Sequence, residues 1–369
     1  MLESVEWGEF RIEDIFDSFN GDFDIKKEHV NGLGNYVITA GMSNNGILGK
    51  TDVEAKIFPK NTITVDMFGT AFYRDFPYKM VTHARVFCLK ANIEINAKQG
   101  LFLSSSLHFL SRFFGYENMC SWAKIKNKKI QLPIKNSQLA LDFMENFVAE
   151  LEARRNAELE AYLSAAGLKD YTLTAEEQQA LAQLAQQQWH EFNLYNLFGK
   201  ATRGKRLKST DRVAGNLPFV TAGEADTGIS AFIGNDVERF KANTVTIDMF
   251  GSAKYRNYEY GGDDHIAVVH TDNLHPMAAL FITSSIHKAS YNGQFNYGRN
   301  FYAKDADALN ILLPEKNGLP DYAYMQTLLS AVQKLVIKDV VQYADNKIAA
   351  TQSVIWRNNQ TKHQVDEAV

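Results

Sequence analysis

The sequence predicts an α+β fold: two homologous, mostly β domains, separated and joined by long helices that pack as an antiparallel coiled-coil pair. Three observations predict it. Residues 61–74 recur as residues 243–256, with ten of the fourteen positions identical. Each copy contains short β-branched and aromatic runs divided by Gly and Asn turns. After a Leu-Pro pair, each copy then passes into a long stretch with apolar residues at helical spacing.

The repeat is a tandem duplication of a unit about half the length of the chain. Residues of the first copy recur 182 positions later, as from Asn61 to Asn243. The same offset relates Trp7 to Trp189 and the Thr-Ala-Gly sequences at 39–41 and 221–223. Because the offset holds so far from the central block, the whole unit is duplicated, and a two-copy protein is expected to meet a two-fold partner.

Composition is that of an ordinary globular protein. The 369 residues suffice for two or three domains, with 45% hydrophobic and 22% charged residues. No apolar run approaches the roughly eighteen residues of a membrane-spanning helix, and the acidic start lacks the apolar core of a signal peptide. Cys88 and Cys120 both lie in the first copy. We therefore expect reduced, buried thiols, a cytoplasmic protein and no membrane partner.

Charge is unevenly distributed along the chain. The net charge of −4 argues mildly against a nucleic-acid binder. Residues 200–212, however, carry six basic side chains against the single acid Asp211. This tract is either a solvated basic loop or a phosphate-binding one.

In chain order, we expect a first domain at 1–136, a helical spacer at 137–188, a second domain at 189–319, and a final long helix with a tail at 320–369. Strands are expected at 36–39, 62–65 and 85–89. The Leu-Pro pairs at 132–133 and 313–314 precede the helical stretches.

Each helical stretch has an apolar stripe and runs for about thirty residues. Gly167 is expected to end the first helix, and a further helix is expected from 175 to 188. The two stripes either pack against each other or each cover their own domain. The stripe residues are Leu139, Phe143, Phe147, Leu151, Leu159 and Tyr162 in the first copy, and Met325, Leu328, Val332, Leu335, Val336, Val340 and Tyr343 in the second.

Together these motifs resemble the specificity subunits of type I restriction–modification systems. Four features carry the resemblance, each occurring twice: Trp-x-Glu-Phe, Thr-Ala-Gly, Asn-Thr-x-Thr-x-Asp-Met-Phe-Gly, and Leu-Pro before a long helix. The residues of these motifs are most similar to those of the related BcgI-like type IIB specificity subunits. The resemblance covers roughly residues 5–355, and the doubled architecture is more specific than any single motif.

The resemblance implies a non-catalytic subunit with two target-recognition domains, each reading one half of a split sequence in double-stranded DNA. It also implies that the long helices set the spacing and dock DNA methyltransferase subunits, two by symmetry. No cofactor is implied, and whether a restriction or translocase subunit joins is left open, as are type I against type IIB and the target bases. Thirty helical residues span about 45 Å, or about 13 base pairs, which fits two contact zones roughly one turn of DNA apart.

Catalytic motifs are missing from the sequence. None of the seven prolines are adjacent, so the Asn/Asp-Pro-Pro-Tyr/Phe motif of adenine methyltransferases is absent. No glycine-rich nucleotide loop is found. The nuclease-like Glu54-Ala55-Lys56 is not repeated in the second copy. A protein-interaction scaffold and a duplicated-fold enzyme with a site between the repeats remain the alternatives.

Repeated histidines raise the question of a metal site. His83 matches His265, and His108 matches His287. No spacing typical of metal ligands accompanies them, so hydrogen bonding or a phosphate contact explains the repetition equally well. We predict no metal, and we interpret Asp66 and Asp248 as turn-capping carboxylates.

Comparison of the two copies predicts the DNA contacts. Arg74 and Arg256 are kept, so we expect them to contact phosphate in both domains, with a framework role as the alternative. The other candidates lie where the copies differ, since those positions are expected to read different bases, with Arg suited to guanine and Asn or Gln to adenine. They are Lys26, Lys27, Asn44, Asn45, Arg112 and Tyr116 in the first copy, and Arg203, Lys205, Arg206, Lys208, Tyr291, Asn292, Gln294 and Arg299 in the second.

Overall fold

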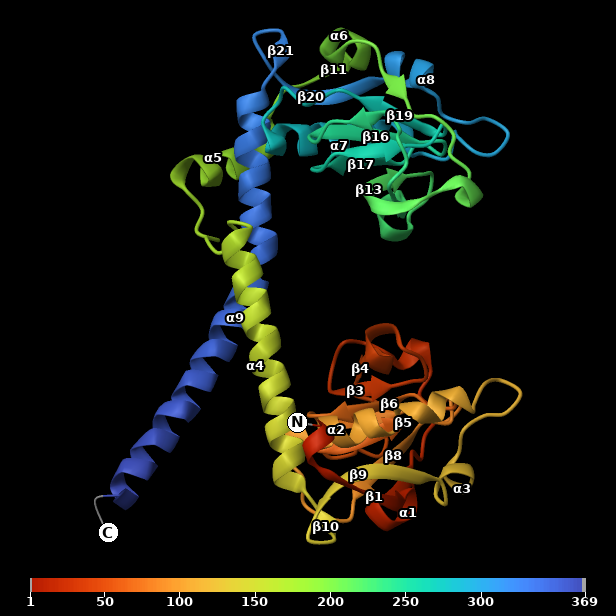
Figure 1. Ribbon diagram of the computed structural model, residues 1–369, viewed down its shortest axis with the longest axis vertical. Helices are drawn as coiled ribbons and strands as arrows, with labels where there is room; N and C mark the ends of the chain where they lie inside the picture. Colours follow the sequence, from red (N-terminus) through yellow and green to blue (C-terminus); the bar gives the residue numbers. More distant parts are fainter. Residues whose placement is uncertain (1, 367–369) are drawn as a thin grey trace. The chain divides into compact units, whose positions relative to one another are not determined.

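The computed structural model describes residues 2–366, with side chains omitted for Ser4 and residues 350–366 (Figure 1). The chain forms two compact units, and each is described by itself. Unit 1 holds the residues up to Ala161 together with α9 from Lys347 onward, and unit 2 spans Tyr162–Asn346. Among the described residues, no helix is long and apolar enough to cross a membrane.

In unit 1, strands from the two ends of the first copy pair with each other. Strand β1 (Glu6–Arg11) pairs antiparallel with β9 (Lys129–Lys135), with Trp7 opposite Pro133. Alternation along β9 buries Ile130 and Leu132, which is the pattern of a strand with one face on the core. The short strand β10 (Gln138–Leu139) returns on β9.

This return of the chain corrects the expected start of the first helix. Leu139 lies in β10 opposite Ile134, so the apolar side chain that fits the helical stripe belongs to a strand. The helix begins two residues later.

Two further sheets form the body of unit 1. The first is antiparallel, in the order β2-β8-β5-β6, and the second has the order β4-β3-β7 with β3 and β7 parallel. Their bounds are β2 Phe16–Asn20, β3 Asn35–Ile38, β4 Ile47–Thr51, β5 Thr62–Val65, β6 Ala71–Arg74, β7 Tyr78–Met80 and β8 Phe87–Ala91.

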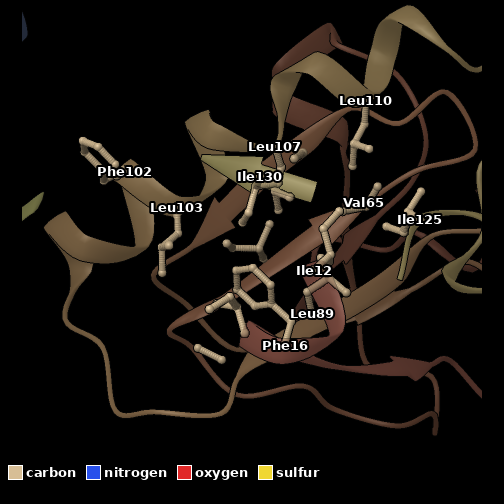
Figure 2. Close-up of a cluster of buried hydrophobic side chains, with 14 of the residues drawn as sticks. Ile12, Phe16, Val65, Leu89, Phe102, Leu103, Leu107, Leu110, Ile125 and Ile130 are labelled. Atoms are coloured by element: carbon tan, nitrogen blue, oxygen red, sulfur yellow. The ribbon is translucent and has the colours of Figure 1, made fainter. Parts of the chain in front are cut away.

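Helix α2 (Ala97–Ser106) packs on β5 and β6 and closes the main core of unit 1. It begins at Asn96, whose side chain accepts a hydrogen bond from the Gln99 backbone, because the first backbone N–H groups of a helix lack partners within it. Figure 2 shows Phe102 and Leu103 of this helix above Phe16 and Leu89 of the sheet. The shorter helical elements of this copy are η1 Leu2–Ser4, α1 Ile12–Ile15, η2 Lys27–His29, η3 Ser43–Gly46, η4 His108–Arg112 and α3 Trp122–Ile125.

Unit 2 repeats this plan, with one more strand, β15, at the edge of its third sheet. Thr244 pairs with Arg256 across β16 and β17, as Thr62 pairs with Arg74 across β5 and β6. The sheets have the orders β11-β20-β21, β12-β19-β16-β17 and β14-β13-β18-β15. The strands are β11 Trp189–Asn193, β12 Thr202–Arg203, β13 Ala214–Val220, β14 Ile229–Ile233, β15 Arg239–Phe240, β16 Thr244–Asp248, β17 Ala253–Arg256, β18 Tyr260–Gly262, β19 Ile266–Val269, β20 Asn310–Lys316 and β21 Leu319–Pro320.

The helical elements of unit 2 are longer where the copies differ. Helix α7 (Pro276–Ser290) has a proline in its first turn and covers β17 and β20. The others are α6 Leu194–Phe198, η6 Ser209–Asp211, η7 Ala225–Gly228 and α8 Ala303–Asp307. The predicted fold class of two homologous, mostly β bodies with long helices is confirmed.

The long helices differ in length. Helix α4 (Leu141–Ala165) ends as expected at Gly167, which has a φ of +67°. There the Leu168 backbone donates to the Leu163 carbonyl at 2.8 Å, a typical glycine-terminated helix end. Helix α9 (Tyr322–Asp366) has 45 residues, more than the thirty expected.

Between them, α5 (Ala175–Gln183) and η5 (Leu184–Gln186) occupy the stretch expected to be helical. Within unit 2, α5 lies against α9, where the Tyr324 hydroxyl donates to the Ala180 carbonyl at 3.0 Å. A helix that precedes the second copy thus becomes part of that copy's own unit.

Candidate functional site

A buried aspartate ties loops together in each unit. One carboxylate oxygen of Asp66 accepts hydrogen bonds from the Phe68 and Thr70 backbones, both at 2.9 Å. Its other oxygen accepts one from Gly41 at 2.8 Å. Asp66 follows strand β5, so it holds the Met-Phe-Gly turn and the distant Thr-Ala-Gly loop at one edge of the sheet.

Asp248 does the same in unit 2. It accepts from Phe250 at 2.9 Å, Ser252 at 3.0 Å and Gly223 at 3.3 Å. The interpretation of both aspartates as turn-capping carboxylates is confirmed.

The repeated arginines are part of this framework. Arg74 is 2% exposed; it donates to the Thr64 hydroxyl at 2.9 Å and to the Asn45 carbonyl at 2.8 Å. Burial lowers the pKa of Arg74 to about 10, which still leaves it charged at neutral pH. Arg256 is 1% exposed and donates in the same way to Thr246 and to the Thr227 carbonyl, both at 2.9 Å.

This burial contradicts the expected phosphate contact of Arg74 and Arg256. A phosphate on the surface cannot reach a guanidinium that is enclosed by its own unit and already hydrogen-bonded there. The framework role, which was the alternative, fits both residues.

The turn held by each arginine has an unusual backbone. Asn44 and Asn45 have φ values of 48° and 51°, and Asp226 and Thr227 have values of 46° and 54°. Left-handed conformations cost free energy for residues with a side chain, and a β-branched residue such as Thr227 is an outlier there. All four residues are exposed, so each unit presents two side chains from a fixed turn.

A third loop meets the Met-Phe-Gly turn through aromatic contacts. Phe68 lies edge-on to Tyr116 with ring centroids 5.1 Å apart, and Phe250 lies the same way against Tyr297 at 5.2 Å. Tyr116 is 75% exposed and Tyr297 is 84% exposed. The backbone also joins these loops, since Cys120 donates to the Met67 carbonyl at 2.7 Å.

Three loops therefore converge beside the aspartate of each unit. In unit 1 they are 41–46, 66–70 and 113–118, and in unit 2 they are their counterparts 223–228, 248–252 and 291–299. The frame that holds them is common to both copies, whereas the exposed side chains differ. An arrangement of this kind can present two different sets of hydrogen-bonding groups in one geometry.

The remaining predicted contact residues are all exposed, in or beside these loops, in the loops before β3 and β13, or, for Arg203, at the end of β12. Lys26 and Lys27 lie before β3 at η2, and Arg112 ends η4 just before the third loop of unit 1. In unit 2, Tyr291, Asn292, Gln294 and Arg299 occupy the third loop, and the guanidinium of Arg299 lies over the Phe295 ring at 5.3 Å. The exposed basic residues before β13 are Arg203, Lys205, Arg206 and Lys208.

The basic loop of unit 2 is anchored next to the left-handed turn. The Lys205 backbone donates to Gly262 at 3.0 Å, and the Leu207 backbone donates to Asp263 at 3.3 Å. Arg212 donates to the Ser230 hydroxyl at 3.2 Å, two residues after the turn ends. The loop thus places a positive surface beside the left-handed turn.

Two features of this surface were missed in the sequence. One is Arg212, counted only as part of the basic tract, and the other is the Phe68–Tyr116 pair with its counterpart. The signal for the second was present, because both aromatic partners recur at nearly the same offset.

The repeated histidines make hydrogen bonds within their units. His108 contacts the Ala71 carbonyl at 3.2 Å, and His287 accepts from the Ala253 backbone at 3.2 Å. Asp263, Asp264 and His265 bring possible metal-ligating atoms within 4.8 Å of one another, an arrangement that exposed acidic groups often show without an ion. The first copy has Val81 and Thr82 in place of the two aspartates.

Both cysteines are buried and free of disulfide bonds, as expected. Burial raises the pKa of Cys88, and it raises the pKa of Cys120 to about 12. A thiol that stays protonated is a poor nucleophile, so neither has the character of a catalytic cysteine.

Comparisons with known proteins agree with this geometry. Residues 4–161 match the type I restriction modification DNA specificity domain. The BcgI type II restriction enzyme specificity subunit of Heyndrickxia coagulans is 22% identical over 344 residues, which cover 91% of this chain and 97% of that protein. The type I restriction–modification S subunit from M. genitalium shares the fold, with a TM-score of 0.62 at 16% identity over 95% of this chain and 94% of its own. Residues 4–161 therefore match the DNA specificity domain of type I restriction–modification systems, and over nearly its whole length the chain is similar to a restriction enzyme specificity subunit, as its repeated motifs indicate.

Proposed function

We propose that each unit reads one half of a split sequence in double-stranded DNA and that the chain itself performs no catalysis. Specificity subunits are non-catalytic, so methylation and cleavage belong to partner subunits. The observation that carries the proposal is that one buried frame is built twice around loops with different exposed side chains. A duplicated frame with diverged loops is what reading two different half-sites requires.

The surface chemistry supports this division. Arg203, Lys205, Arg206 and Lys208 offer exposed positive charge for phosphates, which provides affinity without reading sequence. The amide and aromatic side chains of the convergent loops suit base edges and stacking. Similar exposed groups occur in unit 1 at Lys26, Lys27, Arg112 and Tyr116.

The helices complete the proposal. We propose that α4 and α9 pack antiparallel, set the spacing of the two half-sites and dock two methyltransferase subunits. Exposed apolar side chains support a partner for these helices, with Val336 73% exposed and Tyr162 63% exposed. The complex would act in the cytoplasm, where it meets DNA; a restriction or translocase subunit would be a further partner.

A domain exchange tests the function directly. Residues 1–136 are replaced by the matching domain of another specificity subunit with a known target, and the chain is purified with its methyltransferase partner. Sequencing of methylated DNA should show that one half of the target changes while the other half and the spacer stay the same. Exchange of 189–319 is the matched control and should change the opposite half.

Two results would contradict the proposal. If the exchange alters both halves or neither, the units do not read separately. If the complex fails to retain duplex DNA even at low salt, the chain is better explained as an interaction scaffold. A duplicated-fold enzyme is not favoured, because the relatives found are specificity subunits.

A further inference from the structure

We propose that the left-handed turns Ser43–Gly46 and Ala225–Gly228 are equivalent base-reading elements and that buried Arg74 and Arg256 are their positioning residues. In this proposal, Asn45 reads an A·T pair in one half-site and Asp226 reads a C·G pair in the other. The inference rests on the proposed DNA-recognition function and names the side chains that carry out the reading.

Each turn combines two costly features. Two consecutive residues other than glycine adopt left-handed backbone, with φ between 46° and 54°. A guanidinium is then buried to hold that backbone, although burial of a charge is unfavourable unless it is fully hydrogen-bonded. Asparagine and aspartate tolerate the left-handed region, but Thr227 is strained there, and glycine would relieve that strain. That both copies keep polar side chains in this strained turn supports a role for those side chains.

The arginines hold the backbone and leave the side chains free to differ. Arg74 bonds the carbonyl of Asn45 at 2.8 Å, and Arg256 bonds that of Thr227 at 2.9 Å. Gly46 closes the first turn, where an added Cβ would lie 2.7 Å from the Thr39 carbonyl oxygen. Asn-Asn in one copy and Asp-Thr in the other thus occupy the same conformation.

Within each turn, one exposed polar side chain is available for a partner. The Asn44 amide donates back to the Ile47 carbonyl at 3.3 Å. The Asn45 side chain has no hydrogen-bond partner among the side chains that the structure describes, those of residues 2–349 except Ser4, or among the backbone groups of the same residues. In unit 2, the Thr227 hydroxyl accepts from Arg256 at 3.5 Å, and the carboxylate of Asp226 has no partner in the same described range.

The chemistry of these groups selects the base. An asparagine amide has a donor and an acceptor side by side, which match N7 and the N6 amino group of adenine. A carboxylate only accepts, which matches the N4 amino group of cytosine. Phosphates would otherwise repel the Asp226 carboxylate. The guanidinium of Arg212 bonds Ser230, two residues beyond the turn, so a positive charge lies beside that carboxylate.

The first test reads the target of the full complex of the chain and its methyltransferase partner by sequencing methylated DNA. Asn45→Asp should change one base pair of one half-site from A·T to C·G, and Asp226→Asn should make the reverse change in the other half-site. Asn92→Asp, an exposed substitution of the same chemistry outside the three loops, should leave the target unchanged.

A second variant separates reading from turn structure. Asn45→Gly keeps the left-handed backbone and relieves its strain, so the unit should be at least as stable to heat. The discrimination between cognate DNA and DNA altered at that base pair should nevertheless fall about tenfold or more. If the turn is purely structural, Asn45→Gly should leave this discrimination unchanged.

Arg74→Lys tests the positioning residue. Lysine cannot bond the Thr64 hydroxyl and the Asn45 carbonyl with one planar group. Discrimination in the same half-site should fall while the affinity for non-specific DNA and the reading of the other half-site stay unchanged. An equal loss of specific and non-specific affinity would assign Arg74 to folding alone.

The outcomes distinguish this inference from the proposed function. If domain exchange moves one half-site but Asn45→Asp and Asn45→Gly leave the target and the discrimination unchanged, the turn does not read bases and the inference is overturned. If domain exchange itself fails, the proposed function falls with it.

Discussion

Lys334 of α9 and Glu177 of α5 form an ion pair at 2.9 Å inside unit 2, where Glu177 is 5% exposed. The other carboxylate oxygen of Glu177 accepts a hydrogen bond from Ser330 at 2.6 Å, and the Lys334 ammonium also donates to the Thr172 carbonyl at 2.9 Å. On α4, the positions that correspond to Ser330 and Lys334 are Ala149 and Ala153. The interaction of Glu177 with Ser330 and Lys334, called the α5 latch below, is therefore not repeated in the first copy.

Acid should release the α5 latch. Burial acts to raise the pKa of Glu177, but hydrogen bonds from Ser330, the Thr174 backbone and Lys334 outweigh it and lower the pKa below its ordinary value of 4.5. The stabilisation is thus present above about pH 4.5 and is lost as the pH falls through the lower folded pKa. The protection of the backbone amides of residues 175–183 against hydrogen exchange, relative to an unfolded peptide at the same pH, should fall over that range. Glu177→Gln should show fast exchange already at pH 7 and little further change; an unchanged rate in that variant would count against the latch.

The aromatic pair beside the framework turn should affect DNA binding more than stability. In Phe68→Ala, Tyr116 loses its edge-on neighbour, a contact that contributes about 0.5–1.5 kcal/mol. We expect specific binding of the complex to weaken by about three- to tenfold, with a melting temperature close to that of the parent, because Tyr116 is largely exposed. Phe250→Ala is the matched control. The two variants should be sensitive to base changes in opposite half-sites, and identical behaviour would show that the pairs do not act within separate half-sites.

The basic loop of unit 2 should contribute affinity without sequence preference. Replacing Arg206 and Lys208 with Gln removes two exposed charges. Each phosphate contact contributes about 0.9 to the slope of log affinity against log salt concentration. The slope should therefore fall by about 1.8, with equal losses for specific and random duplexes. Lys338→Gln on α9 removes a charge of the same kind outside the loop; a slope change there of similar size would place the DNA elsewhere.

The sequence was sufficient for the duplication, the fold class and the surface loops, because these follow from local patterns. The offset between the copies located the strand pair around Asp66, and the helical spacing located α4 and α9. The start of α4 was wrong because Leu139 fits a helical stripe and a strand equally well, and only its pairing with Ile134 decides.

The role of the arginines required the fold. A residue kept in both copies can be a shared contact or a shared frame, and the sequence does not separate the two. Arg74 is identified as a framework residue by its hydrogen bonds to Thr64 and Asn45, which lie 10 and 29 positions away in the chain. The α5 latch was hidden for the same reason, since its partners are separated by 157 positions.

The Met-Phe-Gly turn should tolerate no side chain at its glycine. Gly251 has a φ of +86°, and a Cβ added there would run into the Ser290 carbonyl oxygen at the end of α7. Gly293 has nearly the same φ, +85°, but nothing lies within 4 Å of its added Cβ. Gly293→Ala should cost only the left-handed backbone energy, about 1–2 kcal/mol, whereas Gly251→Ala adds a clash with backbone that cannot move without displacing α7.

At about 2–4 °C per kcal/mol, we expect calorimetry of the purified chain to show a decrease of about 2–8 °C in the unit 2 melting temperature for Gly293→Ala. The decrease for Gly251→Ala, measured in the same way, should be clearly larger. Equal effects of the two variants would mean that the turn can separate from α7. In that case Asp248 would hold the three loops of unit 2 without help from the helix, and the frame would be looser than its hydrogen bonds indicate.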